Sequence, residues 1–158
     1  MTPEVIDIYL LPGECFVGDA RHRIRTVLGS CVSITLWHPQ RRIGAMSHFL
    51  LSHRGKQGLA QLSGRYGEEA MALMAGRLQS YGVQARDCQA KIFGGGMMFP
   101  RIERRGLQGV GRRNGEEAEK LLRKYGVPVV SRSLFGVGHR QIIFEVATGD
   151  VWVKQGDA

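Results

Sequence analysis

The sequence predicts a single α+β domain over residues 1–158, with two main helices and a larger number of strands. Its 158 residues, 43% of them apolar, are enough to fill one core. Apolar runs and turn residues alternate at short intervals without a repeat, linker or charge block, as in an α/β or α+β domain. Strand-like segments outnumber helical ones, which favours α+β.

Strand patterns bounded by turn residues are expected at residues 6–10, 31–37, 43–51, 90–93, 127–131, 140–146 and 151–154. In residues 31–37, the apolar Val32, Ile34 and Leu36 alternate with smaller side chains, which predicts a half-buried strand. We expect this strand and residues 43–51 to form a hairpin about Pro39.

Two segments have helical periodicity. Residues 65–81 place apolar side chains near one face and end at Gly82, which suits a left-handed helix cap. Residues 114–125 open with Asn114 and Glu117 as a possible capping pair and end at Gly126, before Pro128.

The hairpin predicts a catalytic pair. Folding about Pro39 and Gln40 opposes residues whose numbers sum to 79, so Cys31 faces His48 on the same side of the sheet. A cysteine attacks as thiolate and needs an activating neighbour at neutral pH, a role that His48 suits. The alternative is that Cys31 is a small buried hydrophobic residue.

The turn before Cys31 offers supporting groups. Gly29 and Ser30 allow a tight bend, and the N–H groups of Ser30 or Cys31 could point at a developing oxyanion. Either Thr26 or Ser33 could supply the third group that orients the imidazole.

Several other classes of protein are disfavoured. The triple glycine at 94–96 lacks the residues of a P-loop, and no histidine spacing suits a metal, so we expect no cofactor and no metal. Three cysteines without a pairing pattern, and the lack of a leader or membrane span, predict a cytoplasmic protein without membrane insertion. The net charge is +8, and basic residues cluster at Arg101, Arg104, Arg105, Arg112 and Arg113. Aromatic residues are not interleaved with these arginines as they are on nucleic-acid-binding surfaces. We therefore expect an acidic protein partner and no nucleic acid.

Four motifs, in order, carry a resemblance to a known family. They are Thr26-Val-Leu-Gly-Ser-Cys31-Val32, His48 within residues 43–51, Ile92-Phe-Gly-Gly-Gly-Met-Met-Phe99, and Val110-Gly-Arg-Arg-Asn114. Together they resemble CheD, the chemoreceptor glutamine deamidase of bacterial chemotaxis. The match runs from about residue 5 to residue 154.

The resemblance implies a cysteine hydrolase that converts glutamine side chains of methyl-accepting receptors into glutamate. It also implies a fold similar to that of toxin deamidases, with mixed or antiparallel β-sheets layered against the two main helices. It assigns the nucleophile to Cys31 and the base to His48. In some members the third residue, a threonine, lies six positions before the cysteine, where this chain has Arg25. The role therefore passes to Thr26.

The resemblance also implies partners and a substrate contact. The partners are the receptor cytoplasmic domain and a CheC-type phosphatase, and a noncatalytic adaptor for either is the alternative function. Gly95 and Gly96 would let the backbone approach beside the site, and Met98 and Phe99 would form an apolar lip that grips a receptor helix. Packing of Met97, Met98 and Phe99 in the core is the alternative.

Overall fold

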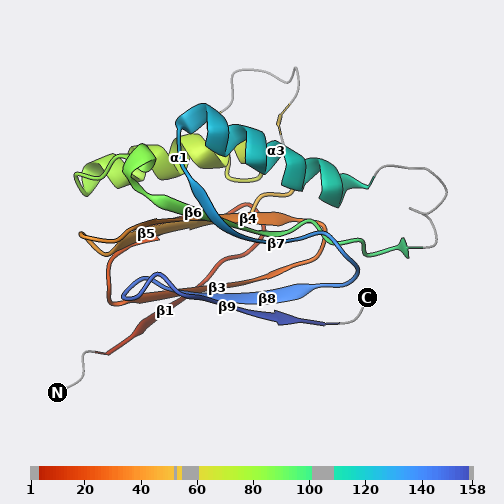
Figure 1. Ribbon diagram of the computed structural model, residues 1–158, viewed down its shortest axis with the longest axis horizontal. Coiled ribbons are helices and arrows are strands. Elements are labelled where there is room, and N and C mark those ends of the chain that lie inside the picture. The colour runs from red at the N-terminus through yellow and green to blue at the C-terminus, as the bar shows by residue number, and fades with distance from the viewer. Residues whose placement is uncertain (1–3, 52, 55–60, 101–108, 157–158) are drawn as a thin grey trace.

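The computed structural model describes residues 4–51, 53–54, 61–100 and 109–156, and these form three layers (Figure 1). Helices α1 (Gly67–Ser80) and α3 (Val110–Tyr125) cover one face of a five-stranded sheet, and a four-stranded sheet lies against its other face. A short 3-10 helix, η1 (Ala85–Asp87), precedes β6. This arrangement confirms the expected α+β class with mixed sheets and two helices.

Each sheet contains both parallel and antiparallel pairs. The five-stranded sheet has the order β2 (Cys15–Gly18), β5 (Ile43–Ser47), β4 (Val32–His38), β6 (Gln89–Gly94) and β7 (Val129–Leu134). The four-stranded sheet has the order β1 (Ile6–Tyr9), β3 (His22–Leu28), β8 (Arg140–Glu145) and β9 (Val151–Gln155). The β1–β3 and β6–β7 pairs are parallel and the other pairs are antiparallel.

The core has two parts, separated by the five-stranded sheet. Val32, Ile34 and Leu36 pack with the helices, as the alternation predicts. The opposite face of β4 lies between the sheets, where Ser33 is also fully buried. The prediction of a half-buried strand is therefore wrong, because β4 is a central strand covered on both faces.

The hairpin of β4 and β5 exists with a different register. Thr35 pairs with Met46 and His38 with Ile43, so paired residues sum to 81 rather than 79. The turn is longer than expected because Arg42, at φ 50°, closes it by donating its N–H to His38 O at 2.8 Å. The shift is even, so it keeps each residue on its predicted face.

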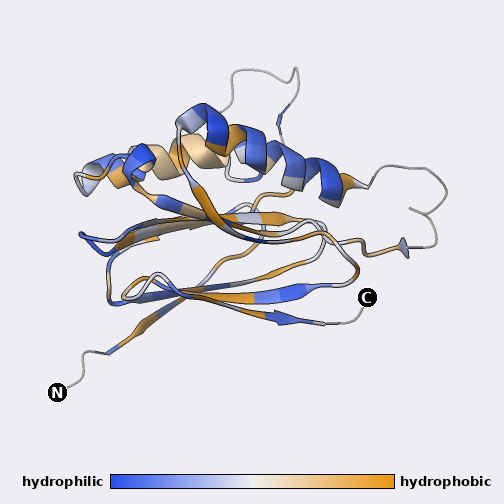
Figure 2. Ribbon diagram, in the orientation of Figure 1, coloured by the Kyte–Doolittle hydropathy of each residue, from blue (hydrophilic) through white to orange (hydrophobic). Residues whose placement is uncertain are grey.

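Both helices begin elsewhere than expected. Helix α1 starts at Gly67 rather than residue 65 and ends before Gly82, whose φ is 73°. Helix α3 starts at Val110 with Gly109 as its N-cap, so the expected Asn114–Glu117 cap is wrong and Asn114 lies inside the helix. Figure 2 shows α3 as mostly hydrophilic with short hydrophobic stretches, as expected of an amphipathic helix on a sheet.

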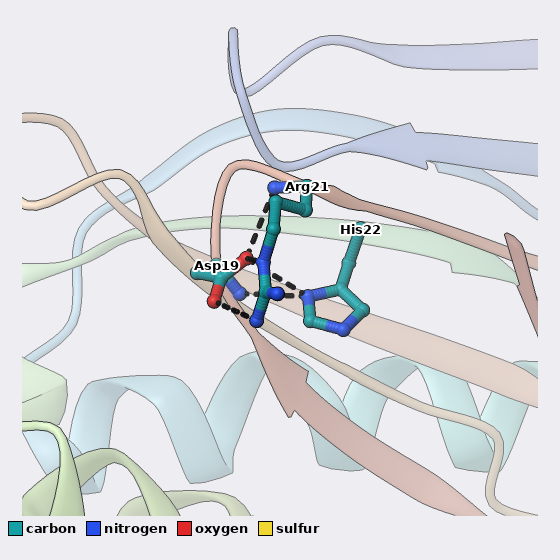
Figure 3. A network of polar contacts seen from close by, with 3 residues as sticks. All are labelled: Asp19, Arg21 and His22. Carbon is teal, nitrogen blue, oxygen red and sulfur yellow. Dashed lines mark hydrogen bonds and ion pairs between the residues drawn. The ribbon is translucent and has the colours of Figure 1, made fainter. Parts of the chain in front are cut away.

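Strands β2 and β3 have no counterpart among the expected elements. A polar network shapes the turn between them: Arg21 donates to both Asp19 carboxylate oxygens, at 3.1 and 3.0 Å, and the Asp19 N–H donates to His22 Nδ1 at 3.0 Å (Figure 3). The hydrogen bond from Arg21 lowers the pKa of Asp19 to about 2. This turn leads directly into β3, the strand that carries Thr26.

Candidate active site

Thr26 and His48 meet between the two sheets. Thr26 lies on the inner face of β3, and His48 follows β5 directly, so the two residues come from different sheets. Thr26 Oγ1 lies 2.6 Å from His48 Nδ1, and the two residues are only 2% and 3% exposed. Of the two candidates for the third group, Thr26 is therefore the one that contacts the imidazole. The Ser33 hydroxyl has no hydrogen-bond partner among the described residues.

A second hydrogen bond of Thr26 sets the tautomer of His48. Thr26 Oγ1 also lies 2.8 Å from the carbonyl oxygen of Leu10, which can only accept. The single hydroxyl proton is therefore donated to Leu10, and Oγ1 accepts the Nδ1–H of His48. The other ring nitrogen, Nε2, is left with a lone pair that can take a proton.

Burial keeps both members of the expected catalytic pair uncharged at neutral pH. It lowers the pKa of His48 from 6.5 to about 4, because the imidazolium ion is desolvated. Burial also raises the pKa of the Cys31 thiol. The resting state is thus a neutral imidazole and a thiol, and the thiol proton must be removed as the sulfur attacks.

Cys31 immediately precedes β4 on the face that points between the sheets. It packs against the same apolar cluster as Met46, which lies two residues before His48. Val32 pairs with Phe49, so Cys31 and His48 are diagonal rather than directly opposed. Side chains at such positions lie roughly 7 Å apart at Cβ. Among the described residues no hydrogen bond joins Cys31 Sγ to the ring. Such bonds often tighten only when substrate is bound.

Cys31 lines a pocket. A cavity of about 410 Å³ is lined by Ser30, Cys31, Leu50, Leu51, Arg65 and Tyr66. Leu51 is 48% exposed, and Arg65 is also exposed, so the rim is partly apolar and partly basic. A side chain that enters from solvent can therefore reach the half-buried Cys31 without displacing the core.

The turn that carries Cys31 is held by its carbonyl groups. Gly96 N–H donates to Gly29 O at 2.9 Å, and Gly95 N–H donates to Cys31 O at 2.9 Å. Asn114 Nδ2 donates to the intervening Ser30 O at 3.4 Å. The N–H groups of Ser30 and Cys31 have no acceptor among the described residues. They are thus free to bind an oxyanion.

The triple glycine packs against backbone. A Cβ at Gly94, whose φ is 105°, would lie 2.2 Å from Cys31 O, so a side chain is excluded there. Gly95 and Gly96 are buried, and a substrate contact for them stays a prediction. Met98 reaches the site, since its Cγ lies 3.2 Å from the Cβ position of Gly29, and Phe99 is 68% exposed. A lip formed by Met98 and Phe99 remains a prediction.

The sequence patterns do not predict two residues that lie at the site. Asn114 is buried and bonded to the nucleophile turn. Arg140, 3% exposed, donates from Nη1 to Gly94 O at 3.0 Å and from Nη2 to Phe135 O, and burial lowers its pKa. The only sequence signal for Asn114 is its place in the Val110–Asn114 motif.

The expected basic surface is described only in part. The arginines at 101, 104 and 105 lie outside the described residues, while Arg112 and Arg113 are exposed on α3. The Arg112 guanidinium lies 4.4 Å from the centre of the Phe135 ring. None of the described helices is both long and apolar enough to cross a membrane.

The site combines a cysteine that lines a pocket with a neutral imidazole that a hydroxyl orients. Beside them are two backbone N–H groups without an acceptor among the described residues. Such an arrangement is suited to acyl transfer from a carboxamide, as in cysteine hydrolases. Comparison with known proteins narrows this class. The family model described as "CheD chemotactic sensory transduction" matches residues 50–155. The chain belongs to the CheD family.

Curated relatives match nearly the whole of this chain, including the candidate site. A "Probable chemoreceptor glutamine deamidase CheD 2" from Albidiferax ferrireducens is 61% identical over 95% of this chain and 87% of the relative. A "Probable chemoreceptor glutamine deamidase CheD 1" from Chromobacterium violaceum is 42% identical over 94% of this chain and 77% of the relative. A "Probable chemoreceptor glutamine deamidase CheD" from Pseudomonas fluorescens is 43% identical over 97% of this chain and 85% of the relative.

Proposed function

We propose that this protein is a chemoreceptor glutamine deamidase that hydrolyses glutamine side chains of methyl-accepting receptors to glutamate. The observation that carries the proposal is the Thr26–His48 contact, which leaves Nε2 as a base on the sheet face that also bears Cys31. Membership of the CheD family and the names of its relatives support the substrate.

In the first half of the reaction, Cys31 is the nucleophile. Its sulfur attacks the carboxamide carbon while His48 Nε2 takes the thiol proton, and the carbonyl oxygen becomes an oxyanion. The N–H groups of Ser30 and Cys31, in the bend that Gly29 permits, stabilise this charge. His48 then donates the proton to the leaving nitrogen, so ammonia departs and a thioester remains.

In the second half, water replaces ammonia. Neutral His48 removes a proton from water, the hydroxide attacks the thioester carbon, and the carbon–sulfur bond breaks. The proton returns to the sulfur of Cys31, and the product is glutamate. Each turnover adds one negative charge to the receptor at neutral pH.

The substrate segment is a receptor helix, with Met98 and Phe99 as a lip beside the pocket that Cys31 lines. Arg65 and the net charge of +8 favour a segment that also carries carboxylates. We place the protein in the cytoplasm, where the receptor segment is accessible. Binding of a CheC-type phosphatase stays a prediction from the resemblance.

The test incubates a purified receptor cytoplasmic domain with the wild-type protein, Cys31→Ala, or Cys15→Ala as the matched control. Mass spectrometry of receptor peptides then measures conversion of glutamine to glutamate. We expect conversion by wild type and Cys15→Ala but not by Cys31→Ala. If wild type converts nothing, or Cys31→Ala performs equally, the deamidase proposal fails and a noncatalytic adaptor remains.

A further inference from the structure

Asn114 lies on the buried face of α3, and its side chain reaches the turn that carries Cys31. It is 2% exposed, and Nδ2 donates to Leu50 O at 2.8 Å as well as to Ser30 O at 3.4 Å. Because both acceptors are carbonyl oxygens, the amide nitrogen must face them. Asn114 therefore joins the segment before the nucleophile to the segment that follows His48.

A glycine one turn earlier allows this close approach. A Cβ at Gly111 would lie 2.7 Å from backbone atoms of Gly95 and Gly96, so a side chain there would push the helix away. Residues three apart share one face of a helix, and Gly111 and Asn114 are such a pair. The neighbouring Arg112 and Arg113 are exposed on the other side.

The bond from Asn114 also determines where an amide points. The described peptide bonds are trans, and in a trans peptide the C=O of one residue and the N–H of the next point in opposite directions. Because Asn114 holds the Ser30 carbonyl on the side of α3, the Cys31 N–H is directed away from the helix. By the same geometry, the bond from Gly96 N–H to Gly29 O directs the Ser30 N–H away from Gly96.

We propose that Asn114 is a positioning residue for catalysis: by holding the Ser30 carbonyl, it fixes the Cys31 N–H as an oxyanion donor. This inference rests on the proposed deamidase function. Gly96 acts through its backbone, whereas Asn114 acts through a side chain that can be replaced. The role differs from activation of the thiol, which belongs to His48.

Two reactions of the same sulfur separate these roles. Deamidation passes through an oxyanion, whereas alkylation by iodoacetamide is a displacement at saturated carbon that forms none. Loss of an oxyanion donor therefore slows the first reaction and leaves the second unchanged. Loss of the Cys31–His48 arrangement, or of the fold, slows both.

The experiment compares wild type, Asn114→Ala and Asn114→Leu, the second being of similar size without a donor. Ala118→Gly is the matched control. It lies one helical turn after Asn114 and weakens α3 without removing a hydrogen bond to the segment that carries Cys31. Receptor deamidation and alkylation of Cys31 by iodoacetamide are both measured. We expect kcat to fall about 10- to 100-fold in both Asn114 variants, somewhat less than for outright deletion of an oxyanion donor. KM and the alkylation rate should stay within about twofold of wild type, and the control should resemble wild type in both reactions.

The outcomes are distinct. Equal loss of deamidation and alkylation in the Asn114 variants would show that Asn114 holds only the catalytic pair or the fold, and would overturn the inference. Undiminished kcat would overturn it as well, with the deamidase function intact. If wild-type protein does not deamidate the receptor, the proposed function fails and the inference falls with it.

Discussion

Replacing Thr26 with valine tests the role of its hydroxyl in the site. Valine keeps the branched shape but removes the acceptor for His48 Nδ1–H and the donor to Leu10 O. Both groups are then left unpaired in a buried place, and each such group costs about 1–3 kcal/mol. We expect Thr26→Val to lower the free energy of unfolding by about 2 kcal/mol or more.

The effect on activity follows from the orientation of the ring. Loss of the Nδ1–H bond removes about 1–3 kcal/mol of the free energy that favours the productive orientation and tautomer of His48. At 1.36 kcal/mol per factor of ten, kcat/KM should fall between about fivefold and 150-fold. Thr26→Ser keeps the hydroxyl and should retain activity within a few-fold. Ser33→Ala removes a buried hydroxyl that has no hydrogen-bond partner among the described residues, and it should change little.

The assay is receptor deamidation, followed by release of ammonia, with thermal unfolding of each variant as the measure of folding. Thr26→Val within twofold of wild type would refute the reasoning. So would a Ser33→Ala variant as impaired as Thr26→Val, because it would give the third role to the other hydroxyl.

Three further predictions concern charge and reactivity at the site. Because His48 must be neutral and its pKa is about 4, kcat/KM should hold down to about pH 5 and fall through pH 4; a midpoint near 6.5 would contradict this. The pKa of His48 in the folded protein lies below its value of 6.5 in the unfolded chain. Burial of neutral His48 therefore contributes fully to the free energy of unfolding above pH 6.5, and this contribution is lost as the pH falls towards 4. At 1.36 kcal/mol per pH unit, this is on the order of 3 kcal/mol, measurable as the difference in pH dependence of unfolding between wild type and His48→Gln; parallel curves would rule it out. Iodoacetamide should label Cys31 faster than Cys15, because His48 can take the proton of the Cys31 thiol, whereas Arg77, which contacts Cys15 Sγ, is a cation that cannot accept one. His48→Ala should lose that preference, and faster labelling of Cys15 in wild type would count against activation by His48.

Alternation and spacing in the sequence were sufficient to predict the α+β class, the β4–β5 hairpin and the side of the sheet shared by Cys31 and His48. The register was not predictable, because it depends on Arg42 adopting a positive φ in the turn. Strand β3 could have been found, since Ile24 and Thr26 alternate with Arg23 and Arg25 in a segment rich in β-branched residues.

Other features depend on contacts between distant segments. Asn114 resembles a helix cap in sequence, and only the position of Gly109 before α3 shows that the helix starts earlier. Its bonds reach Ser30 and Leu50, 84 and 64 residues away along the chain. Local pattern carries no information on such pairs, which follow from how α3 packs on the sheet.

The central claim is that a thioester forms between Cys31 and a receptor glutamine. Hydroxylamine competes with water for a thioester, so adding it during receptor deamidation should convert the target glutamine into a glutamyl hydroxamate, detectable by mass spectrometry of receptor peptides. Wild type should give this product, and Cys31→Ala should give neither hydroxamate nor glutamate. Glutamate formed without any hydroxamate at high hydroxylamine, or by Cys31→Ala at the wild-type rate, would contradict it.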